Sequence, residues 1–222
     1  MSMTRAVLWD MDGTLIDSEE VHWISWRDTM ANEGIAITRE QFLATFGQRN
    51  DAIVPRLLAG ATPERVERIA NAKEERYRDL VRRDGVSLLP GVANWLQRLH
   101  AQGWLQTIAS SAPRANVEVV LEATAAAHFF QGIVSAEDVR RGKPDPEVYL
   151  TAASRAGASP GRCIVVEDAV AGIEGARNAG MRSIGVSPNG KHLPADVVVR
   201  SLDLLASDAF ERLLAADGSH NG

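Results

Sequence analysis

Short apolar segments recur along the chain, and each ends in a polar or small residue. The clearest are residues 6–9, 105–109, 132–134, 164–166, 183–186 and 197–199. Most are rich in Val and Ile and apolar at nearly every position, which predicts strands buried on both faces, as in a parallel sheet. Because helical patterns separate the later strands, we expect an α/β fold: a Rossmann-like, doubly wound parallel sheet.

The helical segments between these strands fall at about residues 90–102, 113–124, 145–157 and 169–179. Gly180 follows the last of them, and a glycine just after the final helical residue is a common helix stop. Residues 1–17 and 89–216 are therefore expected to form the sheet-containing core.

Residues 18–88 interrupt this alternation, because they contain no convincing strand-like run. Trp23, Trp26 and Met30 share one helical face, and residues 63–84 form a clearer amphipathic helix that starts after Thr62. We expect an inserted α-helical domain over residues 18–88. The last residues, 217–222, are expected to be a disordered tail.

Composition excludes several classes of protein. The 222 residues hold 24 Lys and Arg against 29 Asp and Glu, a net charge of −5, and this mild acidic excess argues against nucleic-acid and anionic-membrane partners. No apolar run approaches the roughly 18 residues of a membrane span, and the N-terminus reaches Asp10 too soon for a secretory signal. We expect a cytoplasmic protein, with a monomer favoured because the tryptophans fit a core or cleft better than an interface patch. The single cysteine, Cys163, excludes an intrachain disulfide and is expected to be a buried structural thiol.

Polar residues of the types found in catalytic and metal-binding sites follow several of the predicted strands. They are the segment Asp10–Thr14, the pair Ser110 and Ser111, the pair Glu167 and Asp168, and the segment Gly142–Pro144 before a helix. Ligands of an open parallel sheet bind at the carboxyl ends of its strands, so these groups are expected to meet. Acids this close repel one another, and a hard divalent cation such as Mg²⁺ is one natural solution. Each segment alone also fits a turn or a helix entry; their combination and order favour a site.

The same segments, with Ala171–Ile173 and Ala179–Met181, resemble the motifs of the haloacid dehalogenase superfamily. The resemblance extends from the first strand to about residue 190. The insertion at residues 18–88 resembles the helical cap of the branch that contains β-phosphoglucomutase and many sugar-phosphate phosphatases. The resemblance implies a phosphoryl-transfer enzyme with Mg²⁺ as its cofactor and a small phosphorylated metabolite as its substrate.

Four catalytic roles follow from this resemblance. Asp10 resembles the nucleophile that becomes an aspartyl phosphate. Asp12 resembles the general acid for the leaving oxygen and the general base toward water. Ser110 and Lys143 resemble the groups that hold the phosphoryl oxygens.

The resemblance also implies a metal site and a phosphate-binding turn. Asp168 is expected to bind Mg²⁺ directly, Glu167 directly or through water, Asp10 through its carboxylate and Asp12 through its backbone carbonyl. The backbone N–H groups of Gly13 and Thr14 are expected to face a phosphate.

Substrate contacts are expected from four more residues: His22, Arg49, Lys73 and Ser111. His22 resembles a histidine near the hinge that positions the acid/base aspartate, Arg49 resembles an arginine that grips a distal phosphate, and Lys73 resembles a cap lysine facing the sugar. Alternatives stay open here, with His22 as a packed helix residue and both Arg49 and Lys73 as solvated charges.

Asp12 favours phosphate esters, because a leaving alkoxide needs a proton. A phosphohydrolase ranks first, since Ala112 and Pro113 stand where the mutase has a serine and a lysine. β-Phosphoglucomutase-like transfer between sugar hydroxyls is the alternative. A receiver-like phosphoaspartate switch is the non-enzyme alternative, and the inserted cap argues against it.

Overall fold

The computed structural model describes residues 4–45 and 48–215, and within these residues six strands form one parallel sheet. The strands are β1 (Ala6–Trp9), β2 (Leu105–Ala109), β3 (Gly132–Val134), β4 (Cys163–Glu167), β5 (Arg182–Val186) and β6 (Val197–Val199). Their order is β3-β2-β1-β4-β5-β6. Strands β2 and β3 therefore lie on one side of β1, and the chain then crosses back to place β4, β5 and β6 on the other side. This is the predicted doubly wound topology, and its switch point lies where β1 and β4 end.

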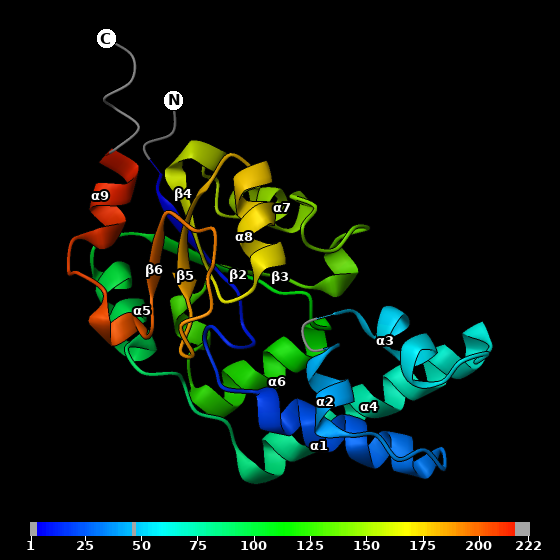
Figure 1. The fold of residues 1–222 in the computed structure, drawn as a ribbon. Coiled ribbons are helices and arrows are strands. Elements are labelled where there is room, and N and C mark those ends of the chain that lie inside the picture. The colour runs from blue at the N-terminus through cyan, green and yellow to red at the C-terminus, as the bar shows by residue number, and fades with distance from the viewer. Residues whose placement is uncertain (1–3, 46–47, 216–222) are drawn as a thin grey trace.

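Helices cover both faces of the sheet (Figure 1). On one face lie α5 (Val92–Ala101), α6 (Arg114–Thr124) and α9 (Ala209–Ala215), which pack with Val7 and Trp9 of β1. On the other face lie α7 (Glu147–Arg155) and α8 (Val170–Asn178), which pack with Ala6 and Leu8. Alternate residues of one central strand therefore serve two cores, which explains why the strand is apolar at every position.

Short 3₁₀ helices complete the core: η1 (Ala127–Phe129), η2 (Ala136–Asp138), η3 (Pro160–Arg162) and η4 (Leu202–Leu204). The sequence prediction placed the helices correctly but began some too early. Helix α5 starts at Val92 rather than residue 90, because Gly91 has a φ of +84° that no helix contains. Strand β4 is longer than predicted at both ends, so Glu167 is its last residue and does not follow it.

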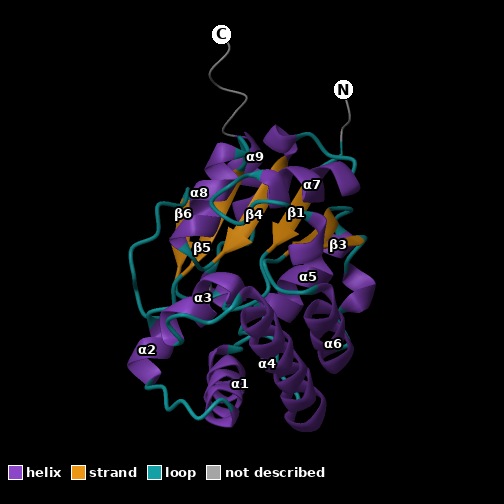
Figure 2. Cartoon of the chain, turned by 90° about the vertical axis from the view of Figure 1, so that its right-hand side faces the viewer, coloured by secondary structure: helices purple, strands orange, loops and turns teal. Residues whose placement is uncertain are grey.

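The inserted segment is helical, as predicted, with α1 (Glu19–Asn32), α2 (Arg39–Leu43), α3 (Asn50–Leu57) and α4 (Pro63–Asp84). Its own apolar cluster contains Trp26, Met30, Phe42, Ile53, Val54 and Ile69. Thr62 caps α4 by accepting a hydrogen bond from the Arg65 N–H. These helices, here called the cap, lie at the end of the sheet to which the strands point (Figure 2).

Two linkers, residues 13–18 and 85–91, join the cap to the core and lie side by side. Ile16 forms an antiparallel bridge with Leu88, and the Leu89 N–H donates to the Leu15 carbonyl at 2.9 Å. We propose that the domain boundaries fall at this pair of linkers, at residues 17/18 and 88/89. Tyr77 and Val81, in the second half of α4, pack into the core cluster, so α4 belongs partly to both domains.

Other sequence expectations have mixed outcomes. Cys163 is fully buried, and burial raises the pKa of its thiol to about 12, in agreement with a structural role. Trp9, Trp26, Trp95 and Trp104 are buried in the apolar clusters. No helix within residues 4–45 and 48–215 combines the length and apolarity of a membrane span. The predicted tail, residues 217–222, lies outside the described residues.

Candidate active site

The carboxylates that sequence analysis singled out meet at the ends of β1 and β4. Asp10 continues β1, since its N–H donates to the Val166 carbonyl at 3.0 Å. Carboxylate oxygens of Asp10, Glu167 and Asp168 all lie within 4.8 Å of one another. Lys143 reaches them from the loop before α7, and its Nζ lies 2.6 Å from Asp10 Oδ1 and 2.7 Å from Glu167 Oε1. The predicted group of acids around one lysine is therefore present.

Burial and neighbouring charges raise the pKa of both Asp10 and Asp168. Burial raises the pKa of Asp10, the Lys143 charge opposes this, and the Glu167 charge adds to it. The pKa of Asp168 is raised by burial and then by the charges of Glu167 and Asp10. Although burial lowers the pKa of Lys143, the two carboxylates it touches raise it well above its ordinary value. One ammonium does not balance three acids, so this donor set fits a hard divalent cation with oxygen ligands.

Two glycines allow the acidic side chains to lie this close to the backbone. Gly13 has a φ of +82°, and a Cβ there would lie 2.2 Å from Asp168 Oδ2. A Cβ at Gly172 would lie 1.9 Å from Glu167 Oε1. Any other residue at either position would displace the carboxylate.

Asp12 has partners of its own, separate from the Lys143 cluster. Its Oδ1 accepts from Ser18 Oγ at 2.5 Å and lies 3.1 Å from His22 Nε2. Burial favours the neutral acid, but the His22 and Ser18 bonds and the Lys73 charge together lower the pKa of Asp12. The two aspartates therefore have opposite shifts only two residues apart, a pattern typical of acid/base chemistry.

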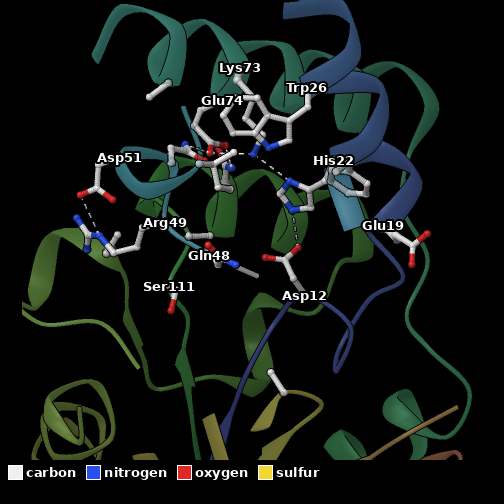
Figure 3. A pocket seen from close by; sticks show the side chains of 18 of the residues that line it. Asp12, Glu19, His22, Trp26, Gln48, Arg49, Asp51, Lys73, Glu74 and Ser111 are labelled. Atoms are coloured by element: carbon white, nitrogen blue, oxygen red, sulfur yellow. Dashed lines mark hydrogen bonds and ion pairs between the residues drawn. The ribbon is translucent and has the colours of Figure 1, made fainter. Parts of the chain in front are cut away.

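His22 lies between Asp12 and Lys73 (Figure 3). Lys73 Nζ lies 2.9 Å from His22 Nδ1, and an ammonium only donates, so Nδ1 accepts. It follows that a neutral His22 carries its proton on Nε2 and donates it to Asp12. The Tyr77 ring stacks on the imidazole at a centroid distance of 4.4 Å, which fixes its plane.

The structure bears on whether Lys73 and Arg49 are solvated charges or line the cavity. Lys73 is 2 % exposed, so its interpretation as a solvated charge is wrong. Arg49 is exposed and lies 3.4 Å from Asp51, yet a side chain at Gly142 would meet its Cδ at 3.4 Å. The arginine therefore lies over the loop that carries Lys143.

The serines and the glycine turn differ in accessibility. Ser110 is buried, and its Oγ accepts from the Ala112 N–H at 3.0 Å, whereas Ser111 lines a cavity. The N–H groups of Gly13 and Thr14 donate to the carbonyls of Ile16 and Met11, at 2.9 and 3.4 Å. In this structure they close the turn, contrary to the expectation that they face a phosphate.

A cavity of about 1010 Å³ opens between the cap and the core. Asp12 and Asp168 line it from the core, and His22, Arg49 and Lys73 line it from the cap. Figure 3 shows Ser111 and Asp12 on the core side, with Arg49 and Lys73 across from them. Asp12, Asp168 and the cap cations Arg49 and Lys73 thus line one cavity.

Known proteins are similar to this chain in sequence and in fold. Residues 7–186 match the family described as haloacid dehalogenase-like hydrolase. The chain belongs to this family.

Among its relatives, Protein CbbY of Rhodobacter capsulatus is 34% identical over 190 residues, which cover 81% of this chain and 84% of CbbY. Hexitol phosphatase B of Escherichia coli is 36% identical over 216 residues, or 91% of this chain and 95% of the relative. The crystal structure of β-phosphoglucomutase from Clostridium difficile superposes with a TM-score of 0.85 at 26% identity, covering 97% and 99% of the two chains. The predicted superfamily and its capped branch are confirmed, and so is the prediction of a hydrolytic enzyme related to phosphatases.

Several residues beside the candidate site of this haloacid dehalogenase-like protein were not predicted from the sequence. Ser18 donates to Asp12, and the Tyr149 hydroxyl donates to Glu167 Oε1 at 3.3 Å. Glu74 and Asn116 lie in the cavity wall beside Lys73. The only signal was adjacency, since Glu74 follows Lys73 directly; the other partners are brought in by tertiary packing.

Proposed function

We propose that the protein is a Mg²⁺-dependent phosphatase of small phosphate monoesters, foremost sugar phosphates, that works through an aspartyl phosphate on Asp10. One observation carries the proposal. Asp10 lies against Lys143 and beside Glu167 and Asp168, the acids that could share a metal ion with it, while Asp12, two residues on, is bonded separately by His22. The similarity to Hexitol phosphatase B supports the substrate class.

The first step transfers the phosphoryl group to the protein. An Asp10 carboxylate oxygen attacks phosphorus, the bond from phosphorus to the ester oxygen breaks, and protonated Asp12 donates its proton to the leaving alkoxide. Lys143 holds the phosphoryl oxygens and Ser110 assists, as charge spreads over them in the transition state. Mg²⁺, held by Asp10, Glu167 and Asp168 and by the Asp12 carbonyl, would neutralise charge on the transferring group.

The second step releases phosphate. Asp12 is now a carboxylate and accepts a proton from a water molecule, whose oxygen attacks the aspartyl phosphate. The bond from phosphorus to the Asp10 oxygen breaks, so inorganic phosphate leaves and Asp10 is regenerated. Despite burial, the His22 and Ser18 bonds lower the pKa of Asp12, which keeps it ionised and able to accept this proton.

The cavity wall favours water over a sugar as the acceptor. Ala112 and Pro113 line the cavity beside Ser111, and neither of these two positions offers a hydroxyl or an ammonium. A mutase-like enzyme must hold a bisphosphate intermediate by both ends, and the expected serine and lysine contacts are absent at these two positions. Isomerisation of sugar phosphates is therefore the second candidate, supported by Arg49 at the cavity rim.

The experiment is a phosphate-release screen over sugar and nucleotide monophosphates with Mg²⁺. β-Glucose 1-phosphate with a bisphosphate primer is assayed in parallel for glucose 6-phosphate. We expect phosphate release, fastest with a sugar monophosphate. Glucose 6-phosphate formation with negligible phosphate release would instead establish the mutase, and no turnover of any ester would contradict both.

A further inference from the structure

Asn116 is a buried core side chain whose amide nitrogen and oxygen each hydrogen-bond a residue of the cap helix α4. It lies in the first turn of α6 and is 0 % exposed. Its Nδ2 donates to Glu74 Oε2, and its Oδ1 accepts from an Arg78 guanidinium nitrogen at 3.0 Å. Both partners come from α4, so this amide joins the cap helix to the core helix. A buried amide left without these partners would cost stability, which makes the contact specific.

The Glu74 carboxylate is the centre of this contact. Its Oε1 accepts from Asn50 Nδ2 at 2.6 Å and from Lys73 Nζ at 2.9 Å, while its Oε2 accepts from Asn116. Glu74 is 7 % exposed, and the charge of Lys73 and the Asn50 bond lower its pKa despite burial. One buried carboxylate therefore connects α3 and α4 of the cap with α6 of the core.

From Glu74 the hydrogen bonds continue to the acid/base. Glu74 holds the Lys73 ammonium, Lys73 donates to His22 Nδ1, and His22 Nε2 bonds Asp12. Helix α6 directly follows the Ser110–Pro113 segment, which carries the proposed phosphate-holding serine. The contact between Asn116 and Glu74 thus fixes the position of the cap residues that bond Asp12 relative to the core segment that carries Ser110.

We propose that Glu74 and Asn116 are positioning residues for the acid/base: their hydrogen bond sets the cap on α6 so that Lys73 and His22 hold Asp12 in place. This inference rests on the proposed function. Neither residue touches the reacting atoms in the mechanism above, and both act through Lys73 and His22.

The test uses the direction of the hydrogen bond, which Asn116 donates and Glu74 accepts. Asn116→Asp places a second carboxylate against Glu74, and Glu74→Gln presents an amide N–H₂ to donors; each change alone mispairs the contact. In the double variant, the new amide at position 74 can donate to the new carboxylate at position 116 and accept from Lys73 and Asn50. That carboxylate in turn accepts from Arg78. Every donor and acceptor is then paired again, with the negative charge moved from α4 to α6.

We expect Asn116→Asp to lower kcat/KM for the best ester about 10- to 100-fold, and the double variant to recover to within about fivefold of the unsubstituted protein. The pH profile of kcat should move to higher pH in Asn116→Asp, because Asp12 loses part of the hold that keeps it ionised. A residue that only stabilises the fold would leave that profile in place. Asp28→Asn is the matched control: Asp28 pairs with Arg76 of α4 at 2.7 Å within the cap alone, and its loss should leave both readouts unchanged.

Hydrogen exchange at the linker amides, Leu89 above all, needs no turnover and separates two kinds of failure. If no ester is hydrolysed, the proposed function fails, yet faster linker exchange in Asn116→Asp that reverses in the double variant still supports the cap–core contact. Should Asn116→Asp not fold, Asn116→Ala replaces it with the same expected direction. A folded variant with unchanged kcat/KM, pH profile and linker exchange would overturn the inference.

Discussion

The Nζ atom of Lys143 lies 2.6 Å from Oδ1 of Asp10, although 133 residues separate them in the chain. The lysine stands in the loop before α7, and the aspartate extends β1 at the switch point of the sheet. This ion pair opposes the rise in the pKa of Asp10 that burial and the neighbouring acids cause. It also places a cation where the proposed nucleophile would meet a phosphoryl group.

Asp10→Asn should abolish phosphate release, because an amide has no carboxylate oxygen to attack phosphorus. We expect a loss of at least about 10³-fold in kcat, with the fold retained, since the side chains have the same size. Asp208→Asn, at an exposed aspartate just before α9, is the control and should keep full activity. Near-normal turnover by folded Asp10→Asn would rule out the covalent mechanism.

Mg²⁺ should bind in the absence of substrate and raise the melting temperature, because it relieves repulsion among Asp10, Glu167 and Asp168. Chelation should abolish activity, and added Mg²⁺ should restore it. Ca²⁺ should stabilise the protein yet inhibit turnover, since its larger and looser ligand shell misplaces Asp10.

Asp168→Asn should reduce the thermal shift at equal Mg²⁺ concentration. Thermal melts with and without EDTA measure this directly. Full activity after exhaustive chelation would remove the metal from the mechanism, and an equal shift in the variant would remove Asp168 from the metal site.

His22→Phe should move the pH profile of kcat to higher pH. The phenyl ring keeps the stacking on Tyr77 but removes one of the bonds that lower the pKa of Asp12, so that pKa rises relative to the unsubstituted protein. If the base step limits turnover, the acidic limb moves up; if the acid step limits it, the basic limb moves up. In both cases the pH profile of kcat shifts to higher pH. His100→Phe, on α5, is the control, and an unmoved profile in His22→Phe would contradict the role assigned to His22.

Arg49→Ala should distinguish the two candidate reactions. In a phosphatase of monoesters it should change KM modestly and leave hydrolysis of a simple aryl phosphate nearly intact, which is the outcome we expect. In a mutase, loss of the distal phosphate contact should slow isomerisation by roughly 30- to 100-fold. Parallel assays of phosphate release and sugar-phosphate isomerisation decide between them.

Asp138→Asn should destabilise the core near β3 at neutral pH. Asp138 accepts hydrogen bonds from Arg155 at 2.6 Å, from Arg114 at 2.8 Å and from Ser135, and these hold its pKa well below the ordinary value of 3.8. Because the pKa of Asp138 is lower in the folded state, its ionised carboxylate stabilises the folded protein above pH 3.8. That stabilisation is lost as the pH falls from 3.8 toward the folded-state pKa. The difference in unfolding free energy between the two proteins should therefore shrink below about pH 4. Urea titrations at about pH 7, 4 and 3 measure it, and a constant difference would contradict the assignment.

The sequence by itself determined the sheet, the insertion and the acidic edge. Ala6–Trp9 is apolar at every position and Cys163–Glu167 at every position but its last, a pattern typical of strands covered on both faces. Once those strands are parallel neighbours, Asp10 and Glu167 must meet, because the carboxyl ends of parallel strands lie at one edge. Local pattern and topology therefore sufficed for this half of the site.

Only the tertiary structure decided how the cap completes it. Lys73 lies on the apolar face of the amphipathic helix α4, four residues after Ile69 and four before Tyr77, so periodicity places it on the packed side but does not specify which groups it meets there. It is buried because α4 packs against α1 and α6 and brings His22 and Glu74 within hydrogen-bond distance. Side-chain partners between separate elements depend on how those elements pack, and hydrophobic periodicity along one element does not specify that packing.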